Sequence, residues 1–488
     1  MRGLRAWEMP MQRSFEEIAP LRFGFGRGPG DAPAPTPETL LAQVPQGAAE
    51  KPSFAEEGSA ERIGRLDALW RQLRKARADK DRQATMAAAQ RRSNYQQDAF
   101  LQDAHARTMG SVGQPLGFYE RLACFWSDHF TVSAAKRSIR ALVGPFEAEA
   151  IRPNVAGDFA TLLRQASLHP TMLFYLDQNR SVGPNSAAAK GKRGLNENLA
   201  REIIELHTLG VEADYTQQDV RQFAELLTGV TVDTRRGSQA FEEASAEPGA
   251  EEVLGRSYGG DPADFAAVLQ ALDDLARHPA TARHIARKLA VHFLADEPPE
   301  EVVRHLEAAY RENDTQLMPV YRALLEHPAS WQTFGQKVRQ PYDWVVAGLR
   351  LCQTTEAGRT LPLTPDDRRR MGGGMADDGG KKKIAMPQNW PWTLRPLGQL
   401  GQLPWTAPGP DGWPEEAAAW ITPQGLAERI DFASRLAKVP LDRVQPETLM
   451  REALGPNGSD RLALLALEAR GPREANALIL LSPELQRR

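Results

Sequence analysis

Apolar residues recur at intervals of three and four along most of the chain. Leu66, Leu69 and Leu73 show this spacing, which places apolar side chains on one face of an α-helix. Strand-like pieces are confined to residues 230–232 and 253–254. The pattern therefore predicts a mainly α fold, a multi-helix globular array with long irregular loops and at most a few short strands.

Changes in composition along the chain predict its domain organisation. The segments are a loosely structured N-terminal segment (1–60), a main helical domain (61–353), a flexible Gly/Lys-rich linker or loop (354–385), and a Trp/Pro-rich belt with C-terminal helices that packs on the main domain (386–488). The belt contains Trp390, Trp392, Trp405, Trp413 and Trp420. These rings either pack against the core or line a groove that binds carbohydrate or peptide by stacking.

The stretch from Asn196 to Gly210 carries the densest set of ionisable side chains in helical register. At about 100° per residue, one arc of this helix collects a charged set. That set is Glu197, Asn198, Arg201, Glu202 and Glu205. Asn196 is suited to the N-cap and Gly210 to the C-cap. We call this predicted helix the central helix.

The charged face of the central helix has two interpretations. In the first it meets water, and each salt bridge adds only ~0.3–0.5 kcal/mol. In the second it turns into a cleft, where Arg201 holds the flanking carboxylates of Glu197 and Glu205. Periodicity alone does not distinguish them, because it says nothing of what covers the face.

A second helix, predicted from Phe118, places His129 on the same face as Phe125 and Trp126, with Asp128 outside that face. A histidine among apolar residues is either a satisfied core group or a buried base or ligand that faces the central helix. The second alternative makes His129 a catalytic candidate.

These two helices supply the candidate site. Glu202, Glu205 and His129 are the candidate catalytic residues, because carboxylates and imidazole serve general acid–base catalysis. The same three residues are the ligands for a divalent metal, if one is bound. The candidate substrate-binding residues are Glu197, Asn198, Arg201, Trp126, Asp128 and Trp413. The motifs typical of haem and nucleotide binding are not met, so the cofactor is either a divalent metal or unknown.

Composition restricts the partners. The chain has 488 residues and a net charge of -3, so no basic excess points to nucleic acid. No apolar run approaches the ~20 residues of a membrane span, and the two cysteines allow at most one disulfide. No secretory signal is evident in the first twenty residues, which predicts a cytoplasmic location without excluding export. The expected partner is a small-molecule or glycan ligand, with a protein partner as an alternative.

Several blocks together resemble one family. They are Glu197-Asn198 through Gly210, Tyr215 through Val220, Leu227-Thr228-Gly229, Phe125 through Phe130, His169-Pro170 with Met172 through Asp177, His278-Pro279 with Thr281-Ala282-Arg283, and Gly409 through Trp413 with Trp420. In this order they resemble the domain-of-unknown-function 1800 family. The resemblance implies a largely helical fold and no particular reaction. Many members carry a His-Asp pair where this chain has Ala246-Glu247-Pro248-Gly249, so an activity that needs that pair would be lost here.

Two functions follow. One is a hydrolase-like enzyme with a carboxylate/His cleft for a polar or glycan-like substrate. The other is a non-catalytic binding or assembly partner whose charged helix is a buried ion network. An enzyme requires these groups to line an open cleft, whereas a scaffold requires each carboxylate to be sealed by a partner.

Overall fold

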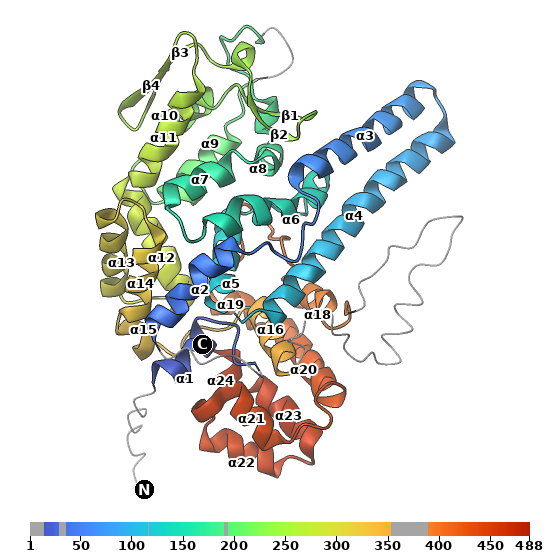
Figure 1. Ribbon diagram of the computed structural model, residues 1–488, viewed down its shortest axis with the longest axis vertical. Helices are drawn as coiled ribbons and strands as arrows, with labels where there is room; N and C mark the ends of the chain where they lie inside the picture. Colours follow the sequence, from blue (N-terminus) through green and yellow to red (C-terminus); the bar gives the residue numbers. More distant parts are fainter. Residues whose placement is uncertain (1–13, 29–35, 116, 190–193, 353–388) are drawn as a thin grey trace.

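The computed structural model describes residues 14–28, 36–115, 117–189, 194–352 and 389–488 (Figure 1). The prediction of a mainly α fold is confirmed. Helices form nearly all of the regular structure, and the described strands make two separate antiparallel pairs. No helix in these ranges is both long and apolar enough to cross a membrane. The predicted linker, residues 354–385, lies outside the described residues.

The N-terminal segment corrects one prediction. Residues 1–60 were expected to be loosely structured, yet α1 (Phe15–Arg22) and α2 (Pro37–Ala49) are formed and bury their apolar sides. Phe23, next to the glycines that follow α1, is fully buried in the main core. The Pro- and Ala-rich composition concealed these helices, because few large apolar residues were needed to anchor them.

Two long helices, α3 (Ser59–Ala78) and α4 (Arg82–Gly113), form a helical hairpin. Ile63 and Leu66 at its base pack against Ala141 and Leu142 of the body. The far end of the hairpin, around residues 79–81, projects away from the rest of the fold (Figure 1).

The main core is built from the middle of the chain. Its helical elements are α5 (Gly117–His129), η1 (Arg137–Leu142), α6 (Val143–Phe146), η2 (Glu147–Ile151), η3 (Arg152–Asn154), α7 (Phe159–Ser167), α8 (Pro170–Tyr175), η4 (Gln178–Arg180), α9 (Asn198–Glu202), η5 (Ile203–Thr208), α10 (Gln217–Leu226), η6 (Glu243–Ser245), α11 (Phe265–Arg277), α12 (Pro279–Phe293), α13 (Glu300–Glu312), α14 (Leu317–Glu326) and α15 (Ala329–Gln332). Strands β1 (Val230–Asp233) and β2 (Ser238–Phe241) pair with Val230 opposite Phe241, and β3 (Gly249–Val253) pairs with β4 (Arg256–Gly260) with Glu251 opposite Tyr258.

A second apolar cluster lies at the other end of the molecule (Figure 1). It joins Trp344 and Trp392 to apolar residues of the C-terminal helices. The helices there are α16 (Pro341–Leu351), α18 (Leu394–Gln399), α19 (Ala417–Trp420), α20 (Pro423–Lys438), α21 (Pro446–Leu454), η7 (Gly455–Asn457), α22 (Asp460–Glu468), α23 (Pro472–Leu481) and α24 (Pro483–Gln486). Cys124 and Cys352 are free thiols.

The central helix is not a uniform α-helix. It begins as α9 and widens into the π-helix η5 at Ile203. Asn196 accepts the backbone N–H of Asn198 at 2.9 Å, so it caps the start, and Gly210 ends the helix with a φ of +90°. π-Helical turns are rare and are frequent at functional sites, which directs attention to the residues packed against η5.

We predict that Gly210→Ala destabilises the protein by about 2 kcal/mol. A φ of +90° disfavours any residue with a Cβ, and an added Cβ would lie 2.8 Å from Nδ1 of His284. The matched control is Gly398→Ala, because Gly398 lies within α18 and a Cβ there meets nothing within 4 Å. Urea denaturation should show the loss for the first variant only. Equal stability of the two variants would contradict this account of the helix end.

Candidate functional site

A cleft of about 770 Å³ opens between α5, α12, the turn after η5 and residues 408–416. Most of its polar lining comes from segments far apart in the sequence. This lining comprises Asp128, His129, Glu212, Arg283, His284, Arg287, Lys288, Asp411, Trp413, Glu415 and Glu416. Three of the predicted site residues, Asp128, His129 and Trp413, line the cleft.

Asp128, near the end of α5, presents a half-buried carboxylate to the cleft. Both of its oxygens accept the backbone N–H of Trp413, at 3.0 and 3.1 Å. The turn comes this close because Gly412 has a φ of +86° and no side chain; a Cβ would lie 2.7 Å from the Asp128 carboxylate. Burial, reinforced by the charges of Glu415 and Asp411 and opposed by Lys288, raises the pKa of Asp128 to about 7. Asp128 can therefore both donate and accept a proton near neutral pH.

Lys288 of α12 faces the same cleft. Within the described residues its amine has no hydrogen bond and no ion pair within 4 Å. Burial lowers its pKa, and the negative charges of Asp128, Glu415 and Asp411 oppose that shift. The amine of Lys288 thus lies among three carboxylates without closing an ion pair with any of them.

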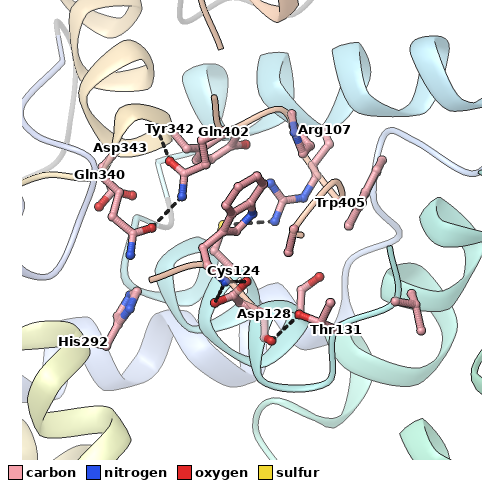
Figure 2. A pocket seen from close by; sticks show the side chains of 15 residues that line it. Arg107, Cys124, Asp128, Thr131, His292, Gln340, Tyr342, Asp343, Gln402 and Trp405 are labelled. Atoms are coloured by element: carbon pink, nitrogen blue, oxygen red, sulfur yellow. Dashed lines mark hydrogen bonds between the residues drawn. The ribbon is translucent and has the colours of Figure 1, made fainter. Parts of the chain in front are cut away.

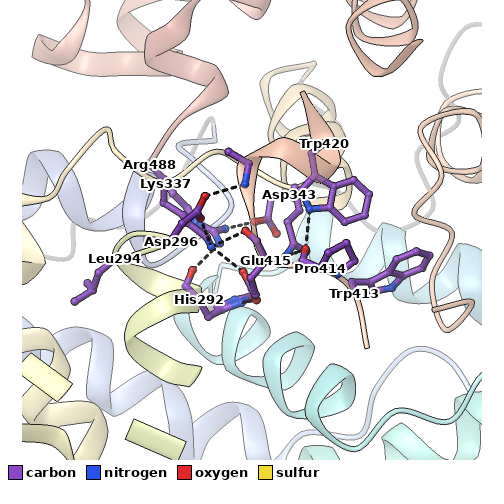
Figure 3. A network of polar contacts seen from close by, with 12 residues as sticks. His292, Leu294, Asp296, Lys337, Asp343, Trp413, Pro414, Glu415, Trp420 and Arg488 are labelled. Atoms are coloured by element: carbon purple, nitrogen blue, oxygen red, sulfur yellow. Dashed lines mark hydrogen bonds and ion pairs between the residues drawn. The ribbon is translucent and has the colours of Figure 1, made fainter. Parts of the chain in front are cut away.

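Glu415 differs from Asp128 because its charge is fully paired (Figure 3). It accepts Nδ1–H of His292 at 2.6 Å and pairs with Nζ of Lys337 at 3.0 Å. Although burial opposes it, these two partners hold the pKa of Glu415 well below its usual range. Arg121 donates to Nε2 of His292 at 2.8 Å, which fixes a neutral imidazole with its proton on Nδ1.

The ion network continues behind the cleft. Arg121 pairs with Asp343 at 2.5 Å, and Arg488 pairs with the same carboxylate. Arg488 also donates to the carbonyl of His292 at 2.8 Å. These buried charges join α12 to α16 and to Arg488 at the C-terminal end of the chain. They therefore give the cleft a rigid rear wall.

A second cavity, of about 60 Å³, lies behind Asp128 and Trp413, which line both spaces (Figure 2). Its lining is largely apolar but includes hydrogen-bonded polar groups. Gln402 accepts the N–H of Tyr342 and donates to Gln340, both at 2.7 Å. A space of this volume with polar partners is large enough for ordered water. Asp128 therefore stands between an open cleft and a small cavity with a few polar groups in its wall.

The predicted charge ladder on the central helix is present. Arg201 donates to Glu205 at 2.9 Å and to Glu197 at 3.2 Å, and Gln217 of α10 bridges Arg201 and Glu197 at 2.8 Å on each side. All three charged side chains are partly exposed, at 22–37%. Asn198 is exposed at the helix start. This face does not line the cleft. Of the stretch from Asn196 to Gly210, only Leu209 and Gly210 line it.

Glu202 is the exception on that face. Its half-buried carboxyl has no hydrogen bond or ion pair in the described part of the chain. Burial, followed by the charges of Glu205 and Asp411, raises its pKa to about 7. Asp411 also lines the cleft and raises the pKa of Asp128, so its charge acts on both carboxyls.

His129 occupies the place of a satisfied core group, although it reaches the cleft wall. Its Nε2 donates to the carbonyl of His207 at 3.1 Å, and Nε2 of His284 donates to the carbonyl of Leu206 at 3.1 Å. Two histidines therefore cap the carbonyls at the end of η5, where the helix supplies no amide partners. Burial lowers the pKa of His129 far below its ordinary value, so it is neutral, and its Nδ1 has no partner among the described residues.

Trp126, another predicted site residue, lies outside the lining of the cleft. Trp126 is fully buried and donates Nε1–H to Tyr321 at 2.7 Å, so its ring has no route to a substrate. Most of the tryptophan belt is also packed: Trp392, Trp405 and Trp420 are buried, and only Trp413 lines the cleft.

Within the described residues, no three His, Cys, Asp or Glu side chains gather closely enough to hold a metal. The proposed sharing of a metal by Glu202, Glu205 and His129 thus has no support in the geometry.

Sequence reasoning missed Lys288, Asp411, His292 and Glu415 as site residues. The sequence does point to Asp411, because Gly409, Pro410 and Gly412 flank this one acid and predict that it lies in a turn. No comparable signal in the sequence marks Lys288, which is one of several basic residues of α12.

The departure at residues 246–249 has a structural role here. Glu247 accepts the backbone N–H of Asn185 at 2.9 Å, and its own N–H donates to Thr228 at 2.7 Å. It thereby fastens part of the loop before the central helix. A Cβ on Gly183 would lie 2.6 Å from Glu247, which shows how closely the two segments approach.

Comparison with protein families matches residues 19–487 to a family described as "Protein of unknown function (DUF1800)". No curated protein and no solved structure matches the chain.

We predict that Glu202→Gln stabilises the protein above neutral pH. The folded state raises the pKa of Glu202 from 4.5 to about 7, so the fold disfavours its charged form and wild-type stability falls as pH rises between these values. The gain of the Gln variant should be near zero below pH 4.5, grow up to about pH 7 and level off at about 1 kcal/mol, allowing for solvent screening.

Urea denaturation at pH 4.5, 6 and 8 measures that gain. The control is Glu197→Gln, which loses its ion pair with Arg201 and should be neutral or slightly destabilised at pH 8. A Glu202→Gln variant that is less stable than wild type at pH 8 would show that this carboxylate has a favourable partner after all.

We also predict that Lys288 is labelled near neutral pH more readily than the exposed Lys75 and Lys80. Only the unprotonated amine reacts with a small acylating reagent, and burial lowers the pKa of Lys288 in an open cleft. Limited acetic anhydride at pH 7.5, read by peptide mass spectrometry, should modify Lys288 before exposed Lys75 and Lys80. Lys337, which is fully buried with two ion pairs, is the unreactive control. Labelling of Lys75 ahead of Lys288 would contradict the lowered pKa.

Proposed function

The chain belongs to the DUF1800 family, and on that premise we propose that it is an acid–base enzyme of the hydrolase class. Its substrate is polar and glycan-like and binds in the cleft of about 770 Å³. One observation carries the proposal: Asp128, with a pKa of about 7, faces an open cleft beside the unpaired amine of Lys288. Strongly perturbed groups that meet in a cleft are typical of catalytic sites.

The proposed reaction needs a protonated acid and a base. Asp128 gives its proton to the oxygen of the leaving group as the bond to that oxygen breaks. The exposed carboxylate of Asp411 takes a proton from the water that attacks the other side. Two carboxyls in these roles are the usual requirement of glycoside hydrolysis.

The remaining residues support this pair. Lys288 lowers the pKa of Asp128 and so tunes its proton affinity. Trp413, half-buried at the wall, offers an apolar ring on which a sugar face can stack. Glu202 is a second proton store next to Asp411, and the Arg201 ladder positions the helix that carries it.

The alternative, a non-catalytic partner, has its own support. Glu197 and Glu205 are each paired by Arg201, and Gln217 completes the network. That arrangement resembles a scaffold more than a reactive site. It is partly exposed rather than sealed, however, and Asp128 and Glu202 stay outside it.

We predict that Asp128→Asn abolishes hydrolysis. The purified protein is screened for release of reducing ends from soluble and insoluble polysaccharides, and against chromogenic glycosides and esters. On any substrate found, Asp128→Asn should lower kcat/KM at least about 100-fold, since general acid catalysis contributes this much. The matched control is Asp431→Asn on the exposed face of α20, which should leave the rate unchanged.

The pH profile tests the assigned role. Activity should fall as pH rises through about 7, because Asp128 must be protonated. Lys288→Met removes the positive charge that lowers this pKa, so the fall should move to higher pH. No hydrolysis of any substrate class would reject the enzyme and favour the binding role, whereas full activity in Asp128→Asn would reject Asp128 as the general acid.

A further inference from the structure

The far end of the helical hairpin is an exposed, strongly basic finger. We define it as residues 70–92, the last turns of α3, the connecting turn and the first turns of α4. Only a narrow apolar seam, formed by Leu73, Ala76 and Ala88, is buried between the two helices. Figure 1 shows this end projecting clear of the body, so nothing in the described fold requires its charges.

The finger holds eight Lys and Arg residues against two Asp, a net charge of +6 in a chain of net -3. The basic residues are Arg71, Arg74, Lys75, Arg77, Lys80, Arg82, Arg91 and Arg92. All except Arg92 are exposed, and only Arg71 has an ion pair in the described structure, with Asp67. The remainder of the chain therefore carries -9, and the charge of the molecule is strongly polarised.

The charges are concentrated on α3 and at the turn, because residues 83–90 of α4 carry none. Lys75 lies on the side of α3 opposite the seam, whereas Lys80 and Arg82 lie at the turn. Arg77 of α3 and Arg92 of α4 approach the ring of Trp70, at 5.7 and 5.3 Å. The unpaired charges of Lys80 and Arg82 are therefore the first to meet an anionic surface that the finger approaches end-on.

We propose that this finger docks end-on into the headgroup layer of an anionic phospholipid membrane. Basic residues near such a surface each contribute about 1 kcal/mol. The distance from Trp70 to the turn, about nine residues at 1.5 Å each, is ~13 Å and spans a headgroup layer.

The charge of the body favours the membrane over a nucleic acid. A duplex lying along the hairpin would approach the acidic remainder of the chain, whereas end-on contact keeps that remainder beyond the ~8–10 Å over which salt screens charge. Binding of this kind is peripheral and salt-sensitive, and it brings the cleft near a surface without inserting the fold.

The test is cosedimentation of the full chain with vesicles of phosphatidylcholine containing about one third phosphatidylglycerol, compared with pure phosphatidylcholine. Wild type should bind the anionic vesicles at least about tenfold more strongly and be released by 0.5 M salt, because the attraction is electrostatic. The test variant is Arg74→Gln/Lys75→Gln/Lys80→Gln/Arg82→Gln. These four exposed residues have no ion pair within the described residues, and their replacement should lower the affinity at least about tenfold.

The matched control removes the same charge elsewhere on the exposed surface, as Arg304→Gln/Arg443→Gln/Arg461→Gln/Arg470→Gln. It should bind like wild type, and circular dichroism should show both variants folded. Equal loss in the two variants, equal binding to neutral vesicles, or tighter binding to duplex DNA than to anionic vesicles at equal phosphate would each overturn the proposal. None of these outcomes bears on Asp128 chemistry, so the two proposals fail independently.

Discussion

The cleft depends on how the end of the central helix is capped. The π-helical turn η5 leaves the carbonyls of Leu206 and His207 without amide partners, and His284 and His129 donate to them. Because these histidines come from α12 and α5, two hydrogen bonds fix the helices that form opposite walls of the cleft. Leaving either carbonyl buried and unpaired would cost about 1–3 kcal/mol. Neutral imidazoles are needed for this role, and burial ensures that both remain neutral by lowering their pKa values.

The charged groups around the cleft form two sets. The rear wall pairs every charge: Glu415 with His292 and Lys337, and Asp343 with Arg121 and Arg488. Asp128 and Lys288 also face the open space but form no ion pair within the described residues, and burial raises the pKa of Asp128 and lowers that of Lys288. Natural proteins tolerate such unfavourable groups where function needs them. The cleft therefore combines a wall of ion pairs with two titratable groups that have none.

The sequence predicted the fold class, the central helix with its caps and the Arg201 ladder, because all of these depend on residues three to four positions apart. It did not predict the π-helical turn, because hydrogen bonding from histidines 78 positions away in either direction decides that geometry. The burial of Trp126 was not predicted for the same reason, because its hydrogen-bond partner Tyr321 is far away in the sequence. The sequence did not predict Lys288 as a site residue, because only the packed structure shows that its amine has no ion-pair partner within the described residues.

Asp411 links the predicted residues to those that were missed. Its charge raises the pKa of Asp128 in the cleft and of Glu202 beside it. The charged face of the central helix lies outside the cleft, and only the end of the helix, at Leu209 and Gly210, lines it. Both acids owe their raised pKa values mainly to burial, and the charge of Asp411 is a secondary cause that they share. A ligand that covers Asp411 would therefore change the pKa values of both acids at once, although only one of them lines the cleft.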